Sequence, residues 1–208
     1  YLASQTKTNI CCHVDHGYTL DECYEGIDSG FTSVMFDGSK LTLKENIKIS
    51  KKIASRAHKY NISIEGEIGF VGYDNGKISE GTNIEDAVTF ANKSNIDAMA
   101  ISVGNTHLQT SKKANIDFKK INLIEAKTKI PLVLHGSSGI PVEQRKKLSR
   151  KTKVAKLNIG TEIRMTFGEA LRKNLKNNPK TYDRLQLLKP TIKDLTKVTK
   201  KIIRQIFI

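Results

Sequence analysis

Three histidines stand where strand-like apolar runs end, and together they could bind a metal ion. They are His16, His107 and His135. An imidazole at the buried end of a sheet is costly unless something uses it. If the three strands are parallel neighbours, the side chains converge on one spot. Three imidazoles with an open fourth position form a catalytic zinc site. The pattern therefore predicts a metalloenzyme.

The carboxylate next to the first histidine is the candidate acid–base group. Asp15 directly precedes His16, so it can reach the same cavity from the tip of the strand. A carboxylate there can move protons at a carbon next to a carbonyl that the metal polarises. The alternative is that Asp15 only orients a ligand histidine.

Three more carboxylates are expected near the cluster. Glu65 and Glu67 alternate with small or apolar residues in one strand, and Asp37 ends the strand before it. Carboxylates inside a barrel are costly unless they are paired or bind a metal. Asp37 and Glu67 could therefore support the ligands or form an alternative metal position. The alternative is that these carboxylates form salt bridges with lysines inside the barrel.

Two strand-end loops have the composition of a phosphate site. Gly136, Ser137, Ser138 and Gly139 follow His135 and precede a helix, while residues 158–161 (Asn-Ile-Gly-Thr) end the next strand and also precede a helix. Small residues let backbone N–H groups approach an anion at a helix N-terminus. In (β/α)₈ barrels such a pair of loops follows strands seven and eight.

The elements that position these residues alternate along the chain. Strands are predicted at Ile10–Asp15, Thr32–Phe36, Ser63–Ile68, Ala98–Val103, Leu132–Leu134 and Val154–Ile159. Helices are predicted at Leu20–Ser29, Lys44–Lys59, Ile84–Ser94, Phe118–Thr128, Val142–Arg150, Ile163–Asn177 and Lys189–Ile206. Alternation of this kind implies a parallel sheet.

The polar residues end nearly every strand, which favours a closed TIM (β/α)₈ barrel over a doubly wound sheet with one switch point. The sequence contains six βα units, but a closed barrel of this type needs eight. We therefore expect residues 1–208 to form a single barrel domain that lacks its first two βα units, so that it is N-terminally incomplete.

Composition argues against nucleic-acid-binding and membrane proteins. The 208 residues carry a net charge of +14 but no basic stripe interleaved with aromatics, so we rank a nucleic-acid binder third and expect no nucleic-acid partner. No apolar run is long enough to span a membrane, and we expect no membrane partner. Three cysteines make no disulfide framework, which predicts a cytoplasmic setting. Two of them, Cys11 and Cys12, are expected to pack within the first strand.

Five motifs together resemble the class II ketose-bisphosphate aldolases, the zinc-dependent fructose- and tagatose-bisphosphate enzymes. The motifs are His13-Val14-Asp15-His16-Gly17, residues 30–39 (Gly-Phe-Thr-Ser-Val-Met-Phe-Asp-Gly-Ser), Glu65-Gly66-Glu67-Ile68-Gly69, residues 135–141 (His-Gly-Ser-Ser-Gly-Ile-Pro) and residues 158–162 (Asn-Ile-Gly-Thr-Glu). The resemblance runs through the whole chain. It implies a TIM barrel that forms a homodimer or homotetramer, and a phosphorylated ketose as substrate.

The resemblance also implies roles for residues. It places zinc on His16, His107 and His135, with Asp37 and Glu67 as an alternative metal position, and it allows a monovalent cation near the phosphate site. Asp15 would be the acid–base at the aldehyde oxygen, and Asn158 would contact the enediolate. The implied phosphate and sugar contacts are Gly136, Ser138, Gly160, Thr161 and, toward the distal phosphate, Lys189. The implied reaction is reversible cleavage of fructose or tagatose 1,6-bisphosphate to dihydroxyacetone phosphate and glyceraldehyde 3-phosphate.

Some residues depart from the family pattern. Leu108 replaces the glycine that follows the second ligand, residues 72–76 lack the loop glutamate and leave only Asp74, and lysine replaces arginine at Lys189. Gly160 stands where many fructose enzymes have aspartate and tagatose enzymes have a small residue. These departures support an alternative, a non-catalytic aldolase-like subunit that stabilises a partner aldolase. The intact histidine set with Asp15 opposes it.

Overall fold

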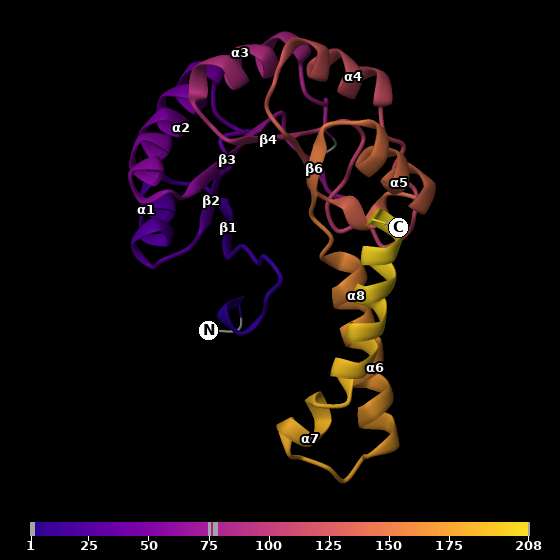
Figure 1. Ribbon diagram of the computed structural model, residues 1–208. Helices are drawn as coiled ribbons and strands as arrows, with labels where there is room; N and C mark the ends of the chain where they lie inside the picture. The colour runs from indigo at the N-terminus through magenta and orange to yellow at the C-terminus, as the bar shows by residue number, and fades with distance from the viewer. Residues whose placement is uncertain (1–2, 75, 77–78, 208) are drawn as a thin grey trace.

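The computed structural model describes residues 3–74, 76 and 79–207 and consists of one curled parallel sheet with helices around its outside (Figure 1). All neighbouring strands are parallel and lie in chain order from β1 to β6. The strands are β1 (His13–Gly17), β2 (Ser33–Phe36), β3 (Ser63–Ile68), β4 (Ala98–Ile101), β5 (Leu132–Leu134) and β6 (Val154–Leu157). Sequential order with one-sided helices is the arrangement of a barrel, as the sequence predicts, rather than of a doubly wound sheet.

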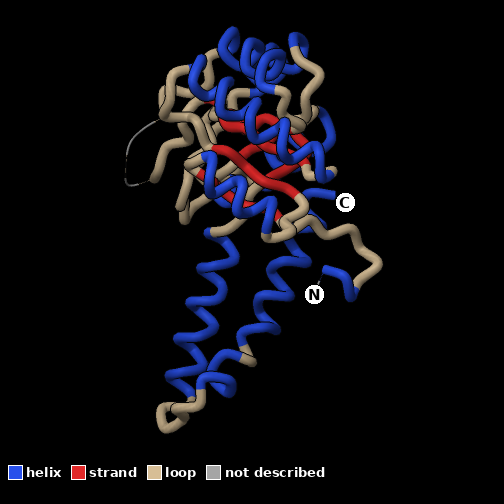
Figure 2. The backbone as a smooth tube through the Cα atoms, turned by 90° about the vertical axis from the view of Figure 1, so that its left-hand side faces the viewer, coloured by secondary structure: helices blue, strands red, loops and turns tan. Residues whose placement is uncertain are grey.

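Five helices cover the convex face of the sheet, and a large apolar core fills the layer between them (Figures 1 and 2). They are α1 (Leu20–Asp28), α2 (Leu43–Ala57), α3 (Ile84–Ser94), α4 (Phe118–Lys127) and α5 (Val142–Lys151), with short 3₁₀ turns η1 (Ala3–Gln5), η2 (His58–Tyr60) and η3 (Ser137–Gly139). Thr19 and Thr42 begin α1 and α2 with capping boxes, which satisfy the first free N–H groups of each helix.

The sheet curls far enough for its two edge strands to meet through their side chains. Lys156 Nζ on β6 lies 3.2 Å from His13 Nε2 on β1, and Asn158 Nδ2, just past β6, donates to Asp15 Oδ1 at 3.1 Å. The structure is therefore a half-barrel whose concave face gathers side chains from both edges. Whether two further βα units complete it stays a prediction.

The last helices leave the half-barrel as an arm. α6 (Thr161–Asn177) runs away from the sheet, α7 (Arg184–Leu188) lies at the far end, and α8 (Thr191–Phe207) returns along α6 to pack on α5 (Figures 1 and 2). The sequence predicts the last helix at Lys189–Ile206, so the observed α8 begins two residues later and ends one residue later. The short helix α7 was not predicted. Within the described residues, no helix is both long and apolar enough to cross a bilayer.

The first predicted strand is wrong in its bounds. β1 begins at His13, and both Cys11 and Cys12 are exposed instead of packed in the core. β1 is an edge strand, and the residues before it pair irregularly: Cys12 N donates to the Thr32 hydroxyl at 2.9 Å instead of continuing a regular ladder. The other predicted elements are present, with ends that differ by a few residues.

Candidate functional site

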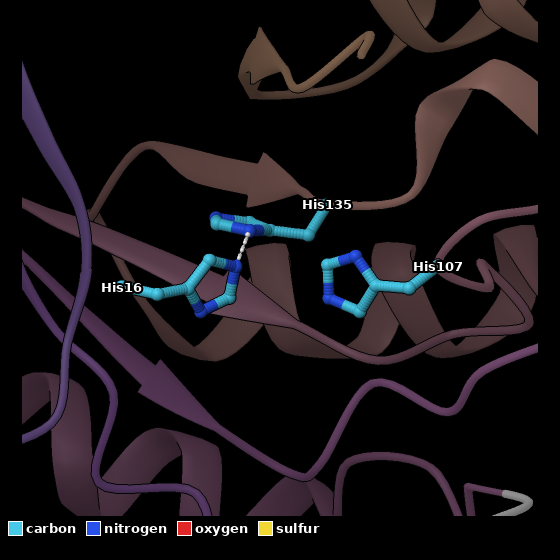
Figure 3. A group of neighbouring side chains, drawn as sticks. All are labelled: His16, His107 and His135. Carbon is cyan, nitrogen blue, oxygen red and sulfur yellow. Dashed lines mark hydrogen bonds between the residues drawn. The ribbon is translucent and has the colours of Figure 1, made fainter. Parts of the chain in front are cut away.

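The three histidines converge at the carboxyl ends of the strands, as their positions in the sequence predict. His16 lies in β1, His107 follows β4 and His135 follows β5. One ring nitrogen from each lies within 4.8 Å of the others, and the rings face one another across a small space (Figure 3). Segments far apart in the chain thus place three nitrogen donors around one point.

A break in β1 lets adjacent residues reach the same cavity. Successive side chains of a regular strand point to opposite faces, yet Asp15 and His16 both line one cavity. His16 has φ +60°, and the pairing register with β2 shifts between Val14 and Gly17. Such an irregularity redirects a side chain, and it is frequent beside functional sites.

Two of the histidines have their outer nitrogen held by a carboxylate. His135 Nε2 lies 2.8 Å from Glu65 Oε1, and His16 Nδ1 lies 2.9 Å from Asp37 Oδ2. If each ring donates its outer N–H to that carboxylate, its inner nitrogen presents a lone pair. These inner nitrogens, His135 Nδ1 and His16 Nε2, lie only 2.9 Å apart. Two lone pairs this close repel unless a proton or a cation lies between them.

Their surroundings shift the pKa values of His107 and His16 in opposite directions. Burial and the charges of His16 and His135 lower the pKa of His107 to about 4, so its ring is neutral at pH 7. Burial also acts to lower the pKa of His16, but the hydrogen bond that His16 donates to Asp37 and the charges of Glu67 and Asp15 outweigh it and raise that pKa. A neutral imidazole is the form that binds a metal.

Asp37 and Glu67 lie together, as the sequence predicts, and His16 joins them as a third donor. One oxygen of each carboxylate and one nitrogen of His16 lie within 4.8 Å of one another. Burial, followed by the charge of Asp37, raises the pKa of Glu67 to about 8, and its Oε2 has no hydrogen-bond partner among the described residues. A buried carboxylate left unpaired in this way fits a site that takes up a cation.

Glu65 forms salt bridges inside the half-barrel, which is the alternative that the sequence left open. Its Oε2 accepts from Lys156 Nζ at 2.7 Å, while its Oε1 pairs with His135. Burial would raise the pKa of Glu65, but the hydrogen bond to His135 and the charge of Lys156 outweigh it and lower that pKa to about 2. Glu65 is therefore an ionised group that orients His135.

A cavity of about 250 Å³ opens over the histidines. Asp15 is exposed at its edge, and Asn158 Nδ2 lies within hydrogen-bond distance of both Asp15 Oδ1, at 3.1 Å, and His135 Nδ1, at 3.2 Å. The cavity thus joins a carboxylate, an amide and the histidine cluster. Among the described residues that line this cavity, Asp15 is the only carboxylate, which makes it the candidate proton acceptor for a ligand bound here.

The predicted phosphate residues line the other side of the same cavity. Gly136, Ser138, Gly160 and Thr161 all border it. Gly136 has φ +60°, and a Cβ there would meet Thr106 O at 2.3 Å, so only glycine fits. Thr161 is the first residue of α6, so the positive end of that helix dipole lies on this side of the cavity, where it favours an anion.

The departures from the family pattern have separate structural outcomes. Leu108 borders the cavity with φ +57°, a backbone conformation that suits glycine better than leucine. Asp74 lines a neighbouring hollow of about 440 Å³ and not the histidine cavity, while Asn75 lies outside the described residues. Lys189 follows α7 and is exposed at the far end of the arm, so within one chain it does not reach the cavity (Figure 1).

Sequence reasoning missed three residues at the site. Arg164, on the first turn of α6, and Tyr73 both line the cavity. Tyr73 stacks on His107 with ring centroids 5.1 Å apart. Lys156 anchors Glu65 from inside the half-barrel. Arg164 could have been found from its place three residues after Thr161, since that puts it in the first turn of a helix whose N-terminus is expected to bind an anion.

Comparison with known sequences matches nearly the whole chain to one protein family. A sequence model described as class II fructose-bisphosphate aldolase matches residues 1–207. A 6-phospho-5-dehydro-2-deoxy-D-gluconate aldolase of Shouchella clausii is 35% identical over 201 residues, which cover 94% of this chain and 68% of the relative. A fructose-bisphosphate aldolase of Staphylococcus epidermidis is 34% identical over 200 residues, which cover 94% and 70%.

Solved structures show the same fold. The putative fructose-1,6-bisphosphate aldolase of Coccidioides immitis has a TM-score of 0.82 at 21% identity, covering 98% of this chain and 73% of that one. The YdjI aldolase of Escherichia coli K12 has a TM-score of 0.77 at 24% identity, covering 99% and 72%. At these identities the likeness concerns the fold alone.

Proposed function

The chain belongs to the class II fructose-bisphosphate aldolase family and is an aldolase, a carbon–carbon lyase, and from this we propose that it cleaves a phosphorylated ketose with zinc held by His16, His107 and His135. The observation that supports this most directly is the pair of inner nitrogens of His16 and His135, 2.9 Å apart with their outer nitrogens on carboxylates. Family membership favours the enzyme over the alternative of an inert subunit.

The donor set fits zinc. Three neutral imidazoles with an open position form the ligand set of catalytic zinc, and carboxylates behind two of them would fix the ring orientation. When bound, zinc supplies a Lewis acid that polarises the ketone and stabilises negative charge on its oxygen. Asp37 and Glu67 offer the same ion a second position beside His16.

Asp15 would transfer the proton, and Asn158 would stabilise the negative charge of the enediolate. As a carboxylate, Asp15 would take the proton of the hydroxyl next to the bond that breaks, while the electron pair of that C–C bond moves toward the ketone carbon. Asn158 Nδ2 would hold Asp15 in place and donate to the enediolate that remains. Protonation of the enediolate carbon then completes the ketone product.

The phosphate would bind at Gly136, Ser138, Gly160 and Thr161, on the α6 N-terminus. Arg164 adds a positive charge on the same side of the cavity. This placement puts the ketone, which is next to the phosphorylated carbon, between the phosphate loops and the histidines. Any monovalent cation near the phosphate would bind beside these loops.

Two substrate classes are candidates. Fructose and tagatose 1,6-bisphosphate carry a second phosphate at the far end. A 6-phospho-5-dehydro-2-deoxygluconate, the substrate in the name of one relative, carries a carboxylate there. Both have a ketone beside a phosphorylated carbon, so the residues described above would serve either.

Cleavage assays with the three ketose phosphates test the proposal. We expect turnover of at least one, loss of turnover after EDTA treatment, and recovery with zinc. Asp15→Ala should lower kcat by about 10²–10⁴-fold, the usual contribution of a general acid–base, while zinc content stays at one ion per chain. Full activity in the metal-free protein, or in Asp15→Ala, would contradict the assignment.

We also propose that the chain forms a homo-oligomer through its arm. Large apolar side chains are exposed along α6, α7 and α8; they are Leu175, Leu185, Leu188, Ile192 and Ile203. Large apolar side chains exposed together on one arm support an association surface. Light scattering should give the mass of a dimer or tetramer, and a monomer at micromolar concentration would contradict this part of the proposal.

A further inference from the structure

We propose that Lys112, Arg145 and Glu162 form an ionic clamp that holds the turn around Ser138 in an anion-binding conformation, which makes them positioning residues for phosphate. The proposal rests on the function proposed above, since it concerns the phosphate subsite. The three residues come from different segments: Lys112 from the loop between β4 and α4, Arg145 from α5 and Glu162 from the first turn of α6.

The clamp binds the two carbonyl groups of the turn. Arg145 donates from Nε to Ser137 O at 3.1 Å and from Nη2 to Ser138 O at 2.9 Å. Lys112 Nζ donates to the same Ser138 O at 2.9 Å. Both cations also meet Glu162 Oε2, Arg145 at 2.8 Å and Lys112 at 2.7 Å. One carboxylate oxygen thus ties together two cations that share one carbonyl.

This arrangement orients one peptide group of the turn for an anion. Arg145 holds the Ser137 carbonyl on the protein side, so the Ser138 N–H of the same peptide points to the opposite side, where an anion can accept it; the neighbouring Gly139 N–H donates to Gly136 O at 3.4 Å. Ser138 is fixed a second time, because Glu162 N donates to its Oγ at 3.1 Å. With that acceptor position filled, the Ser138 hydroxyl proton is free to point into the cavity that Ser138 lines.

The burial of Arg145 argues that the clamp is more than a surface ion pair. Its side chain is fully buried, and its Nη1 has no hydrogen-bond partner among the described residues. Burying a guanidinium is costly, and a leucine or methionine could fill a helix position against the core more cheaply. The position therefore uses arginine for its contacts with the turn and not for packing alone.

The charges add to the effect of geometry. Two cations and one anion lie directly behind the turn, which leaves one net positive charge near the bound phosphate. Burial would raise the pKa of Glu162, but hydrogen bonds from Lys112 and Arg145 outweigh it and lower that pKa, so the carboxylate is ionised at pH 7. The carboxylate of the clamp is thus charged over the neutral pH range.

Two clamp variants and one matched control test the proposal in the full chain. Arg145→Met removes the donor to Ser137 O and one of the two donors to Ser138 O. Lys112→Met removes one donor from a half-exposed residue, so it should fold even if Arg145→Met does not. Leu148→Ala is the control, because Leu148 is a fully buried residue of the same helix that belongs to the apolar core. Binding of inorganic phosphate is measured by titration, and KM and kcat with the cleaved ketose phosphate.

We expect each clamp variant to weaken phosphate and to raise KM by about tenfold, the loss of one charge-assisted hydrogen bond, with a smaller change in kcat. Lys112→Arg should restore most of the affinity. Leu148→Ala should lower the unfolding temperature but leave phosphate affinity within twofold of the wild type. Wild-type phosphate affinity in Lys112→Met, or an equal loss in Leu148→Ala, would overturn the clamp.

The phosphate titration separates this proposal from the proposed function. A protein that binds phosphate and loses it in the clamp variants, yet cleaves no ketose phosphate, supports the clamp and contradicts the function. A protein that cleaves its substrate with unchanged KM in both clamp variants contradicts the clamp alone. A wild-type chain that binds no phosphate contradicts both.

Discussion

Glu67 should make the metal-free protein less stable as the pH rises, and Glu67→Gln should remove that dependence. The Glu67 side chain is 1% exposed, and burial with the nearby charge of Asp37 raises its pKa from 4.5 to about 8. Between these two pH values the folded chain holds a proton that the unfolded chain has released. Stability therefore falls as pH rises through this window and levels off above it.

The size of the effect follows from the shift. Each pKa unit corresponds to about 1.4 kcal/mol, so the free energy of unfolding should fall by about 4 kcal/mol between pH 5 and pH 8 through this one group. Glutamine keeps the shape of the side chain without the proton equilibrium. Relative to the wild type, Glu67→Gln should therefore gain about 4 kcal/mol over the same interval.

Urea unfolding in EDTA at several pH values between 5 and 9 measures the difference. EDTA is needed because a metal ion on His16, Asp37 and Glu67 would replace the proton. Glu85→Gln is the control, since Glu85 lies on the surface of α3 with its side chain 74% exposed. Stability curves of Glu67→Gln and the wild type that run parallel across this range would refute the reasoning, because Glu67 would then be ionised in both states.

Two further predictions concern the departures at the cavity. Leu108→Gly should relieve about 1 kcal/mol of backbone strain at φ +57°, mostly offset by the entropy of glycine. The free energy of unfolding should thus change by less than about 1 kcal/mol, while KM falls because the backbone N–H groups become accessible; a higher KM would contradict this. Arg164→Gln should raise KM about tenfold, as for a lost charged hydrogen bond. Arg172→Gln is its control, since both arginines fold back over a glycine four residues earlier and only Arg164 lines the cavity; equal effects would show a change in α6 instead.

The sequence predicted the gathering of the site because it depends on one general property. The carboxyl ends of parallel strands lie at one end of the sheet, so polar residues that end several strands must come together. His16, His107 and His135 meet for this reason, as do the two phosphate loops. This inference needs only the order of strands, which alternation with helices reveals.

The backbone detail at β1 could not be predicted in the same way. In a regular strand Asp15 and His16 would face opposite sides, and only the irregular register with β2 brings both to the cavity. The side chains of Asp15 and His16 give no sign of that irregularity, because it is set by pairing with a distant segment. The exposure of Cys11 and Cys12 has the same origin, since it depends on where pairing with β2 starts.

Glu65 and Glu67 show most clearly where local sequence stops being informative. They are the same residue type, two positions apart on one strand, and both are buried. The hydrogen bond to His135 and the charge of Lys156 on β6 lower the pKa of Glu65 to about 2 against the effect of burial. Burial and the charge of Asp37, which follows β2, raise the pKa of Glu67 to about 8. One carboxylate becomes a fixed anion that orients His135, and the other becomes a proton or cation acceptor. Their opposite roles depend on distant partners, because Lys156 lies 91 residues after Glu65 and Asp37 lies 30 residues before Glu67. Only the folded structure therefore distinguishes the two glutamates.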